Sequence, residues 1–234
     1  MTEPAPRKSD LGVRVVSAVV MVVVAGTALW LGDWVWLAFV ALVALGVLWE
    51  WRTLTSAFQH RTLWNVSGLV YVFIAGATLA QFRLASGPLP VVLLVGSVVA
   101  TDIGAYFTGR AIGGPKIAPA ISPSKTWAGL VGGMLAAGLF LASYLSWGWS
   151  NLSFPYEDVP MAALAIIGAL LGAVAAALAQ LGDFFESWMK RRAAVKDSGQ
   201  LIPGHGGLFD RVDGLLAVCF VAGLFSLPRA VGWP

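Results

Sequence analysis

Apolar segments as long as a membrane-spanning helix recur along the chain, and this pattern limits its fold more than any other feature. A helix that crosses a bilayer needs roughly 20 predominantly apolar residues. Short polar segments separate about seven stretches that meet this rule. They are residues 12–32, 34–51, 63–82, 88–107, 126–147, 160–182 and 208–228. We therefore predict an all-α, polytopic integral membrane bundle with about seven transmembrane helices.

The composition indicates the same class of protein. Hydrophobic residues make up 58% of the chain and charged residues 12%, with a mean hydropathy of +0.80 and a net charge of +3. Such values are typical of an integral membrane protein, whose partners are membrane lipids rather than nucleic acid. The single cysteine, Cys219, excludes a disulfide framework and a cysteine-based metal site. Without a clear repeat or a long linker, residues 1–234 are predicted to form one membrane domain, with N-terminal helices in 1–100 and the functional motifs in 101–234.

The distribution of Lys and Arg predicts the orientation of the chain. With the N-terminus in the cytoplasm and the helices alternating in direction, most of the 15 basic residues lie in or beside cytoplasmic segments. They are Arg7, Lys8, Arg14, Arg52, Arg61, Arg110, Lys116, Lys125, Lys190, Arg191, Arg192, Lys196 and Arg211, which leaves Arg83 and Arg229 outside. The polar loops 108–125 and 188–207 are then predicted to face the cytoplasm together.

The run from Ser187 to Asp213 places many charged residues between two apolar segments. Charged groups are costly near a bilayer and persist mainly where they line a polar cavity and serve a function. The charged and titratable residues of this run are Lys190, Arg191, Arg192, Lys196, Asp197, His205, Asp210, Arg211 and Asp213. The run therefore predicts a functional site at the membrane surface.

Acidic residues stand at the facing ends of the last two segments. Asp183 lies in L-G-D-F-F-E-S at the end of the sixth segment, while Asp210 and Asp213 share a helical face at the start of the seventh. If the two helix ends meet, three carboxylates converge on one pocket. Mg²⁺ is commonly held by one or two carboxylates together with substrate phosphates. The alternative is that Asp210 and Asp213 only form ion pairs with neighbouring cations.

A glycine-rich turn precedes the seventh segment. Glycines let main-chain N–H groups turn toward an anion, and a helix N-terminus offers unsatisfied donors. The G-H-G-G sequence of residues 204–207 is therefore a candidate phosphate cradle, although a plain turn is the alternative. His205 could donate a hydrogen bond to a phosphate, stabilise the loop or, least favoured, act as a general acid.

A second polar group follows the fourth segment. Asp102 interrupts that segment, and an ionisable residue at such a position is a functional candidate by default. An Asp neutralised by a neighbour for packing alone is the other interpretation. The S-P-S-K-T-W sequence from Ser122 leads into the fifth segment, so we expect Lys125 in the first helical turn, where an anion shared with the helix N-terminus would explain its charge.

Four of these stretches resemble motifs of the phosphatidate cytidylyltransferase (CDP-diglyceride synthetase) family and occur in the family's order. They are D-I-G-A-Y-F-T-G-R from Asp102, S-P-S-K-T-W from Ser122, L-G-D-F-F-E-S from Leu181, and the run from Ser187 to Asp213. The resemblance covers most of residues 102–213. It departs from the family at Ala128, where many members carry an acidic residue, and the chain is short for a fully elaborated member.

The resemblance implies that CTP and phosphatidic acid react to give CDP-diacylglycerol and pyrophosphate. It also implies a Mg²⁺ requirement, K⁺ as a candidate second cation, a membrane homodimer, and a location in a bacterial-type inner (plasma) membrane. Asp183 and Asp210 match the family's metal ligands. The candidate catalytic residues are Lys125, Lys190, Arg191, Lys196, Asp197, His205, Arg211 and Asp213. The candidate substrate-binding residues are Asp102, Tyr106, Arg110, Ser122, Ser124, Thr126, Ser187, Gly206 and Gly207.

Three other functions are compatible with parts of this pattern. A CTP-dependent lipid kinase would use similar phosphate loops, and a cytidylyltransferase acting on an isoprenoid lipid would share nearly all the motifs. A transporter would explain Asp102 and the basic cytoplasmic face without chemistry. A transport pathway should place polar residues across the full depth of the membrane, whereas here they gather on one predicted side.

Overall fold

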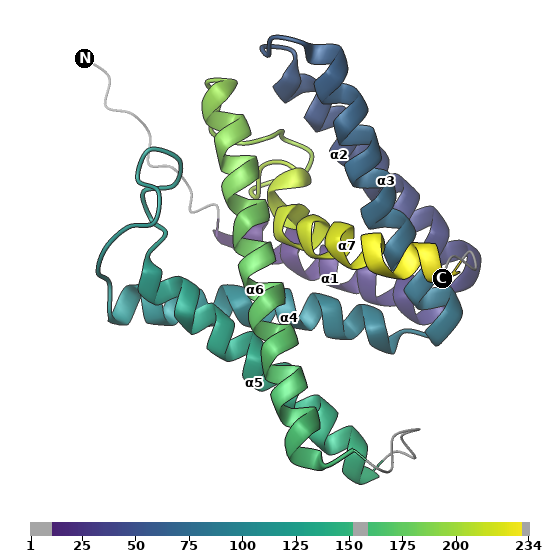
Figure 1. Ribbon diagram of the computed structural model, residues 1–234. Helices are drawn as coiled ribbons and strands as arrows, with labels where there is room; N and C mark the ends of the chain where they lie inside the picture. Colours follow the sequence, from purple (N-terminus) through teal and green to yellow (C-terminus); the bar gives the residue numbers. More distant parts are fainter. Residues whose placement is uncertain (1–10, 152–158, 231–234) are drawn as a thin grey trace.

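The computed structural model describes residues 11–151 and 159–230 and is helical throughout (Figure 1). The helices are α1 (Leu11–Leu31), α2 (Asp33–Thr55), α3 (Arg61–Ser86), α4 (Leu89–Ala111), α5 (Trp127–Asn151), α6 (Met161–Arg192) and α7 (Phe209–Ala230). The described residues contain no strand, only two isolated β-bridges within loops. The predicted all-α class is confirmed. Arg7 and Lys8, which counted toward the predicted orientation, lie outside the described residues, as does the side chain of Arg229.

Six of these helices, α1 to α6, are long and apolar enough to cross a membrane, judged on the described residues. The seventh predicted segment is helical as α7, but its first turns carry Asp210, Arg211 and Asp213. The chain is therefore a multi-pass membrane protein in which α7 combines an apolar body with a charged beginning.

Helix α6 continues well past residue 182, where the predicted segment ended. Its 32 residues span about 48 Å, which exceeds the roughly 30 Å hydrocarbon core of a bilayer. Glu186 and Met189 in its last turns are buried, so this part packs against protein and remains helical. The polar loop predicted to begin at residue 188 instead begins at Ala193. We call residues 193–208 the signature loop.

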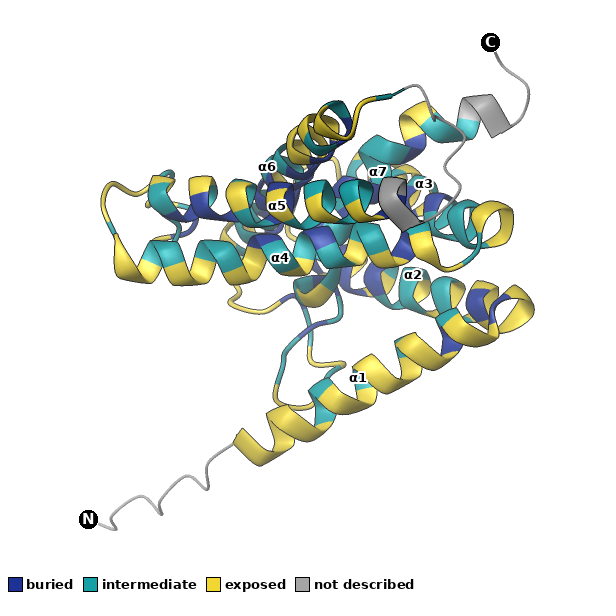
Figure 2. Ribbon diagram, turned by 90° about the horizontal axis from the view of Figure 1, so that it is seen from below, coloured by how far each residue is buried: buried dark blue, intermediate teal, exposed yellow. Residues whose placement is uncertain are grey.

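The helices form two groups that meet where α6 contacts α7. Helix α5 packs against both α4 and α6, while α3 packs against α2 and α7. Helix α1 lies along one side of the bundle and is largely exposed (Figure 2). Close approach of α5 and α6 depends on glycine, because a Cβ atom at Gly168 would lie only 2.7 Å from the backbone of Ala142.

An aromatic core fixes the position at which α7 begins. Phe209, the first residue of α7, is buried with its ring centroid 5.6 Å from that of Trp51 on α2. The Trp51 indole donates a hydrogen bond to the carbonyl oxygen of Trp64 on α3 at 2.9 Å. Cys219 is buried in the same cluster. The first turn of α7 is therefore held by apolar packing in addition to the contacts of its acidic residues.

Candidate active site

A polar cavity of about 500 Å³ lies between α4, α6, α7 and the two loops that flank them. Residues from all four motif stretches line it, although they are far apart in the sequence. The polar and charged residues of its lining are Asp102, Ser122, Asp183, Glu186, Ser187, Lys190, Arg191, Lys196, Asp197, Asp210, Arg211 and Asp213. We call this space the main cavity.

A second cavity of about 430 Å³ lies between α4 and α5 beside the main cavity. Its lining mixes apolar groups with the candidate substrate-binding residues Tyr106, Arg110, Ser124 and Thr126 and the candidate catalytic residue Lys125. Asp102 lines both cavities, so the two spaces adjoin at this side chain. The Arg110 guanidinium donates to the Tyr106 hydroxyl at 3.0 Å.

Contacts between the loop 112–126 and α6 bring the two motif regions together. The Lys125 ammonium pairs with the Asp183 carboxylate, and both side chains are about a quarter to a third exposed (24% and 30%). The Arg191 guanidinium also donates to the carbonyl oxygen of Ile121 at 3.3 Å. Lys125 therefore reaches the main cavity's acidic wall from a loop more than 50 residues earlier in the chain.

The beginning of α5 differs slightly from the expectation. Helix α5 starts at Trp127, and the Thr126 hydroxyl accepts a hydrogen bond from the Gly129 N–H at 3.0 Å. Thr126 is thus the N-cap, and Lys125 precedes the helix rather than lying in its first turn. Its side chain is free of the helix and extends to Asp183.

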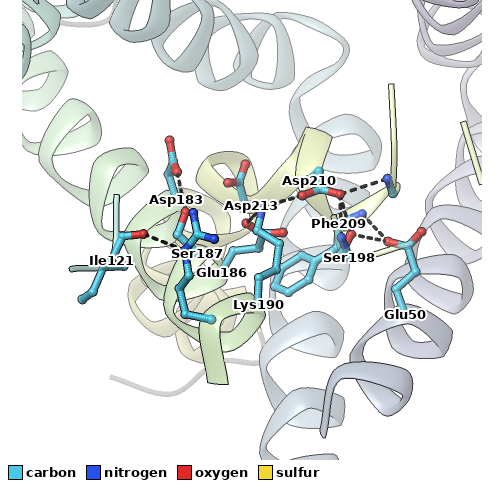
Figure 3. A network of polar contacts seen from close by, with 12 residues as sticks. Glu50, Ile121, Asp183, Glu186, Ser187, Lys190, Ser198, Phe209, Asp210 and Asp213 are labelled. Atoms are coloured by element: carbon cyan, nitrogen blue, oxygen red, sulfur yellow. Dashed lines mark hydrogen bonds and ion pairs between the residues drawn. The ribbon is translucent and has the colours of Figure 1, made fainter. Parts of the chain in front are cut away.

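Lys190 lies between two buried carboxylates. Its ammonium nitrogen is 2.6 Å from Glu186 Oε2, one turn earlier on α6, and 2.6 Å from Asp210 Oδ1 on α7 (Figure 3). The side chains of Glu186 and Asp210 are only 1% and 6% exposed. Glu186 Oε1 has no hydrogen-bond partner within the described part of the chain. The Lys190 ammonium group therefore forms ion pairs with two carboxylates that are almost inaccessible to solvent.

Asp210 binds the signature loop at two positions, Ser198 and Gly207. Its Oδ2 atom accepts hydrogen bonds from the Ser198 N–H at 2.9 Å, the Ser198 hydroxyl at 2.8 Å and the Gly207 N–H at 2.9 Å. Its Oδ1 atom is occupied by Lys190. The predicted metal ligand Asp210 is thus fully engaged by protein groups in this structure.

Glu50 on α2 is a site residue that the sequence analysis missed. Its carboxylate accepts hydrogen bonds from the Leu208 N–H at 2.9 Å, the Phe209 N–H at 2.7 Å and the Ser198 hydroxyl at 2.9 Å. It is only 1% exposed. An acid within the W-E-W-R end of the second apolar segment is itself a signal, because ionisable residues in such segments are commonly functional.

The glycine-rich turn offers few free donors for a phosphate. The N–H groups of Gly207, Leu208 and Phe209 all bind the carboxylates of Asp210 or Glu50. Positive φ values at Gly204 (76°) and Gly206 (85°) are typical of a tight turn. These facts favour the plain-turn interpretation over the phosphate cradle.

His205 lies away from both cavities. Its Nδ1 atom is 2.7 Å from the hydroxyl of Ser17 on α1, and neither cavity includes its side chain in the lining. Of the three roles considered from the sequence, the contact to Ser17 fits the stabilisation of the loop.

The carboxylates that face the main cavity can supply oxygen ligands to a metal ion. Asp183 and Asp213 line its wall, and Asp213 Oδ1 accepts a hydrogen bond from the Gly214 N–H at 2.9 Å. Within residues 11–151 and 159–230, no three or more His, Cys, Asp and Glu side chains are grouped to hold a metal. Mg²⁺ needs only one or two carboxylates when substrate phosphates complete its shell. The carboxylate oxygens of Asp183 and Asp213 therefore fit Mg²⁺ bound together with a nucleotide.

Lys190→Met is predicted to destabilise the fold strongly. Among the described residues Lys190 is the cation that pairs with both Glu186 and Asp210, and its loss leaves the buried Glu186 carboxylate without a partner, at a cost of about 3–5 kcal/mol. Thermal unfolding of the purified protein in detergent measures this effect. Lys196→Met is the matched control, since Lys196 lines the same cavity and is exposed. Equal unfolding temperatures for the two variants would contradict the ion-pair arrangement.

Comparisons with known proteins agree with the arrangement of motifs. The phosphatidate cytidylyltransferase of Brucella suis biovar 1 is 44% identical over 173 residues, which cover 70% of this chain and 57% of the relative. That of Rickettsia bellii is 37% identical over 229 residues, 94% of each chain, and that of Rickettsia felis is 33% identical over 229 residues, 95% of each. The chain thus spans less than two thirds of the Brucella relative and nearly all of the Rickettsia ones.

The model of the cytidylyltransferase family matches residues 60–227. This region contains α3 to α6, most of α7 and both polar loops, but not Glu50. The matched region and the full-length Rickettsia relatives confirm the resemblance that the motifs predicted. The chain belongs to the cytidylyltransferase family.

Proposed function

We propose that this protein transfers the cytidylyl group of CTP to phosphatidic acid, giving CDP-diacylglycerol and pyrophosphate. The observation that carries the proposal is the main cavity, where four separate motif stretches bring several cations and carboxylates together between membrane helices. Relatives that cover almost the whole chain are phosphatidate cytidylyltransferases, which supports the same activity.

The reaction needs positioning and charge neutralisation more than proton transfer. The phosphate of phosphatidic acid is already an anion at neutral pH, so it can attack the α-phosphorus of CTP without a strong general base. Pyrophosphate leaves as the new bond to the lipid phosphate forms. Lys196 and Arg211, on the wall of the main cavity, would neutralise the triphosphate as its charge shifts toward the leaving group.

The two adjoining cavities suit the two substrates. The main cavity is lined mostly by charged and polar residues and can receive the triphosphate. The second cavity borders the apolar helices α4 and α5 and presents Arg110 and Lys125, so it can receive the lipid phosphate while the acyl chains remain in the membrane. Asp102 and Lys125 lie where the two phosphates would meet.

Bound Mg²⁺ would supply the positive charge that the protein's own cations do not provide for the nucleotide phosphates. Asp183 and Asp213 face the main cavity and would hold it. Asp210, which the family resemblance also assigns to the metal, would first have to release Lys190. K⁺ as a second cation stays a prediction from the resemblance.

Release of pyrophosphate from CTP tests the proposed activity. With purified protein, Mg²⁺ and phosphatidic acid in mixed micelles, we expect pyrophosphate to appear in step with a CDP-linked lipid. A lipid kinase would release CDP instead, and an isoprenoid-lipid enzyme would react only when an isoprenoid phosphate replaces phosphatidic acid. Either of those outcomes, or no reaction with any acceptor, would overturn the proposal.

Lys125→Met is predicted to lower kcat/KM for CTP by about ten- to a hundredfold. Loss of a charge-assisted contact costs about 1.5–3 kcal/mol, and most of that cost should appear in the transition state. The control is Lys116→Met, because Lys116 belongs to the same loop but lines neither cavity. Initial rates at varied CTP should separate the two variants. If both retain wild-type rates, the loop 112–126 has no part in the reaction.

We also propose that the main cavity faces the cytoplasm of a bacterial cell, where CTP is present. Cysteines introduced in a Cys219→Ser background at Gln200 and Ser86, both exposed, should react from opposite sides of the membrane. An impermeant thiol reagent added outside spheroplasts should label only the cysteine at residue 86. Labelling of residue 200 under these conditions would contradict the orientation.

A further inference from the structure

Glu50 is a buried acid without a cation beside it. Within the described residues, no Lys, Arg or His lies within ion-pair distance of its carboxylate. Removing an ionised carboxylate from water is costly unless hydrogen bonds replace the lost solvation. The donors here are the Ser198 hydroxyl, within the signature loop, and the N–H groups of Leu208 and Phe209, where the loop ends and α7 begins.

The start of α7 explains why a carboxylate is stable at this position. The first N–H groups of a helix have no partner inside the helix, and its dipole places partial positive charge there. Glu50 accepts hydrogen bonds from the N–H groups of Leu208 and Phe209. Residues at helix starts usually supply such a cap themselves, whereas here the cap comes from α2.

Ser198 connects this cap to Asp210. Its hydroxyl oxygen lies 2.9 Å from Glu50 Oε2 and 2.8 Å from Asp210 Oδ2. A hydroxyl has one proton to donate, so the two carboxylates share it. The loop is closely fitted around them, because a Cβ atom at Gly207 would lie 2.7 Å from Glu50 Oε2. Glu50, Ser198 and Asp210 therefore form one continuous polar connection from α2 to the main cavity.

We propose that Glu50 is a positioning residue for the reaction in the main cavity. It lines neither cavity, but it fixes the end of the signature loop and the first turn of α7. That turn carries Asp210, Arg211 and Asp213, which line the main cavity. The inference rests on the proposed cytidylyl transfer for its kinetic part, and on the contacts alone for its structural part. It assigns a role to a residue outside the matched family region, 60–227.

Glu50→Gln tests the inference with almost no change in shape. The amide keeps one acceptor oxygen but turns an NH₂ group toward N–H groups that need an acceptor. We expect kcat to fall by about ten- to a hundredfold with a smaller change in KM for CTP, because the phosphate-binding groups are present but displaced. Hydrogen exchange of the backbone from residue 197 to 210 should accelerate, while exchange in α3 stays at the wild-type rate.

Thr55→Val is the matched control on the same helix. Thr55 is fully buried and its hydroxyl contacts Asn65, away from the signature loop. This variant loses a buried hydrogen bond, yet kcat and exchange in the loop should match the wild type. If kcat of Thr55→Val falls as much as that of Glu50→Gln, the proposal is overturned. Any loss of a buried contact in α2 would then reduce kcat, and Glu50 would have no specific role.

Ser198→Ala tests the positioning role if the Glu50→Gln protein does not fold. It keeps both carboxylates and removes only the hydroxyl between them, so kcat should fall roughly tenfold and loop exchange should accelerate. Wild-type kcat and exchange in this variant, or in a folded Glu50→Gln protein, would overturn the positioning role. Loop exchange is measured without substrates, so it tests the Glu50 contacts even if the wild-type protein transfers no cytidylyl group.

Discussion

The ion pair between Lys190 and Asp210 joins the end of α6 to the start of α7, and the polar part of the structure depends on it. Asp210 also binds Ser198 and Gly207 of the signature loop, while Lys190 pairs with Glu186. A buried ion pair contributes little net stability, because desolvation offsets much of the attraction. Its effect here is geometric: it fixes the distance and register of two helix ends around the main cavity.

Apolar packing supplies the stability that this polar cluster lacks. Phe209 packs on Trp51 at the start of α7, and glycines such as Gly168 let α5 approach α6 closely. The packing positions the helix ends, and the carboxylates of Asp210 and Glu50 hold the loop between them. The main cavity lies between α4, α6 and α7 and adjoins the second cavity between α4 and α5, an arrangement that suits the proposed pairing of a nucleotide with a lipid phosphate.

The helices could be predicted because each one corresponds to a continuous apolar segment of the sequence. A run of about 20 apolar residues requires a spanning helix whatever its neighbours are. The predicted starts lie within two residues of the observed ones, while α2 to α5 each extend four residues beyond the predicted end. The end of α6 was the main error. Lys190 and its basic neighbours were interpreted as a loop, but Glu186 and Met189 on the same turns are buried by contacts that no local pattern reveals.

The candidate site could be predicted only as far as its motifs extend. The motif residues indicated that Lys125, Asp183 and Asp213 belong together, and the structure places them at one cavity or its border. The donors of the glycine-rich turn could not be followed in the same way. The N–H groups that directly follow the turn bind Glu50, which lies 158 positions before Leu208 in the chain, so only the fold brings it to the start of α7.

The central claim is that the cytidylyl group of CTP is transferred to phosphatidic acid. Following the α- and γ-phosphorus atoms of CTP through the reaction tests this claim most directly. Purified protein is given phosphatidic acid with CTP labelled at either the α- or the γ-phosphorus, and the lipid is then extracted. Direct attack on the α-phosphorus predicts that the α-label enters the lipid and the γ-label appears only in pyrophosphate. Transfer of the γ-label to the lipid, or exclusion of the α-label from it, would contradict the account.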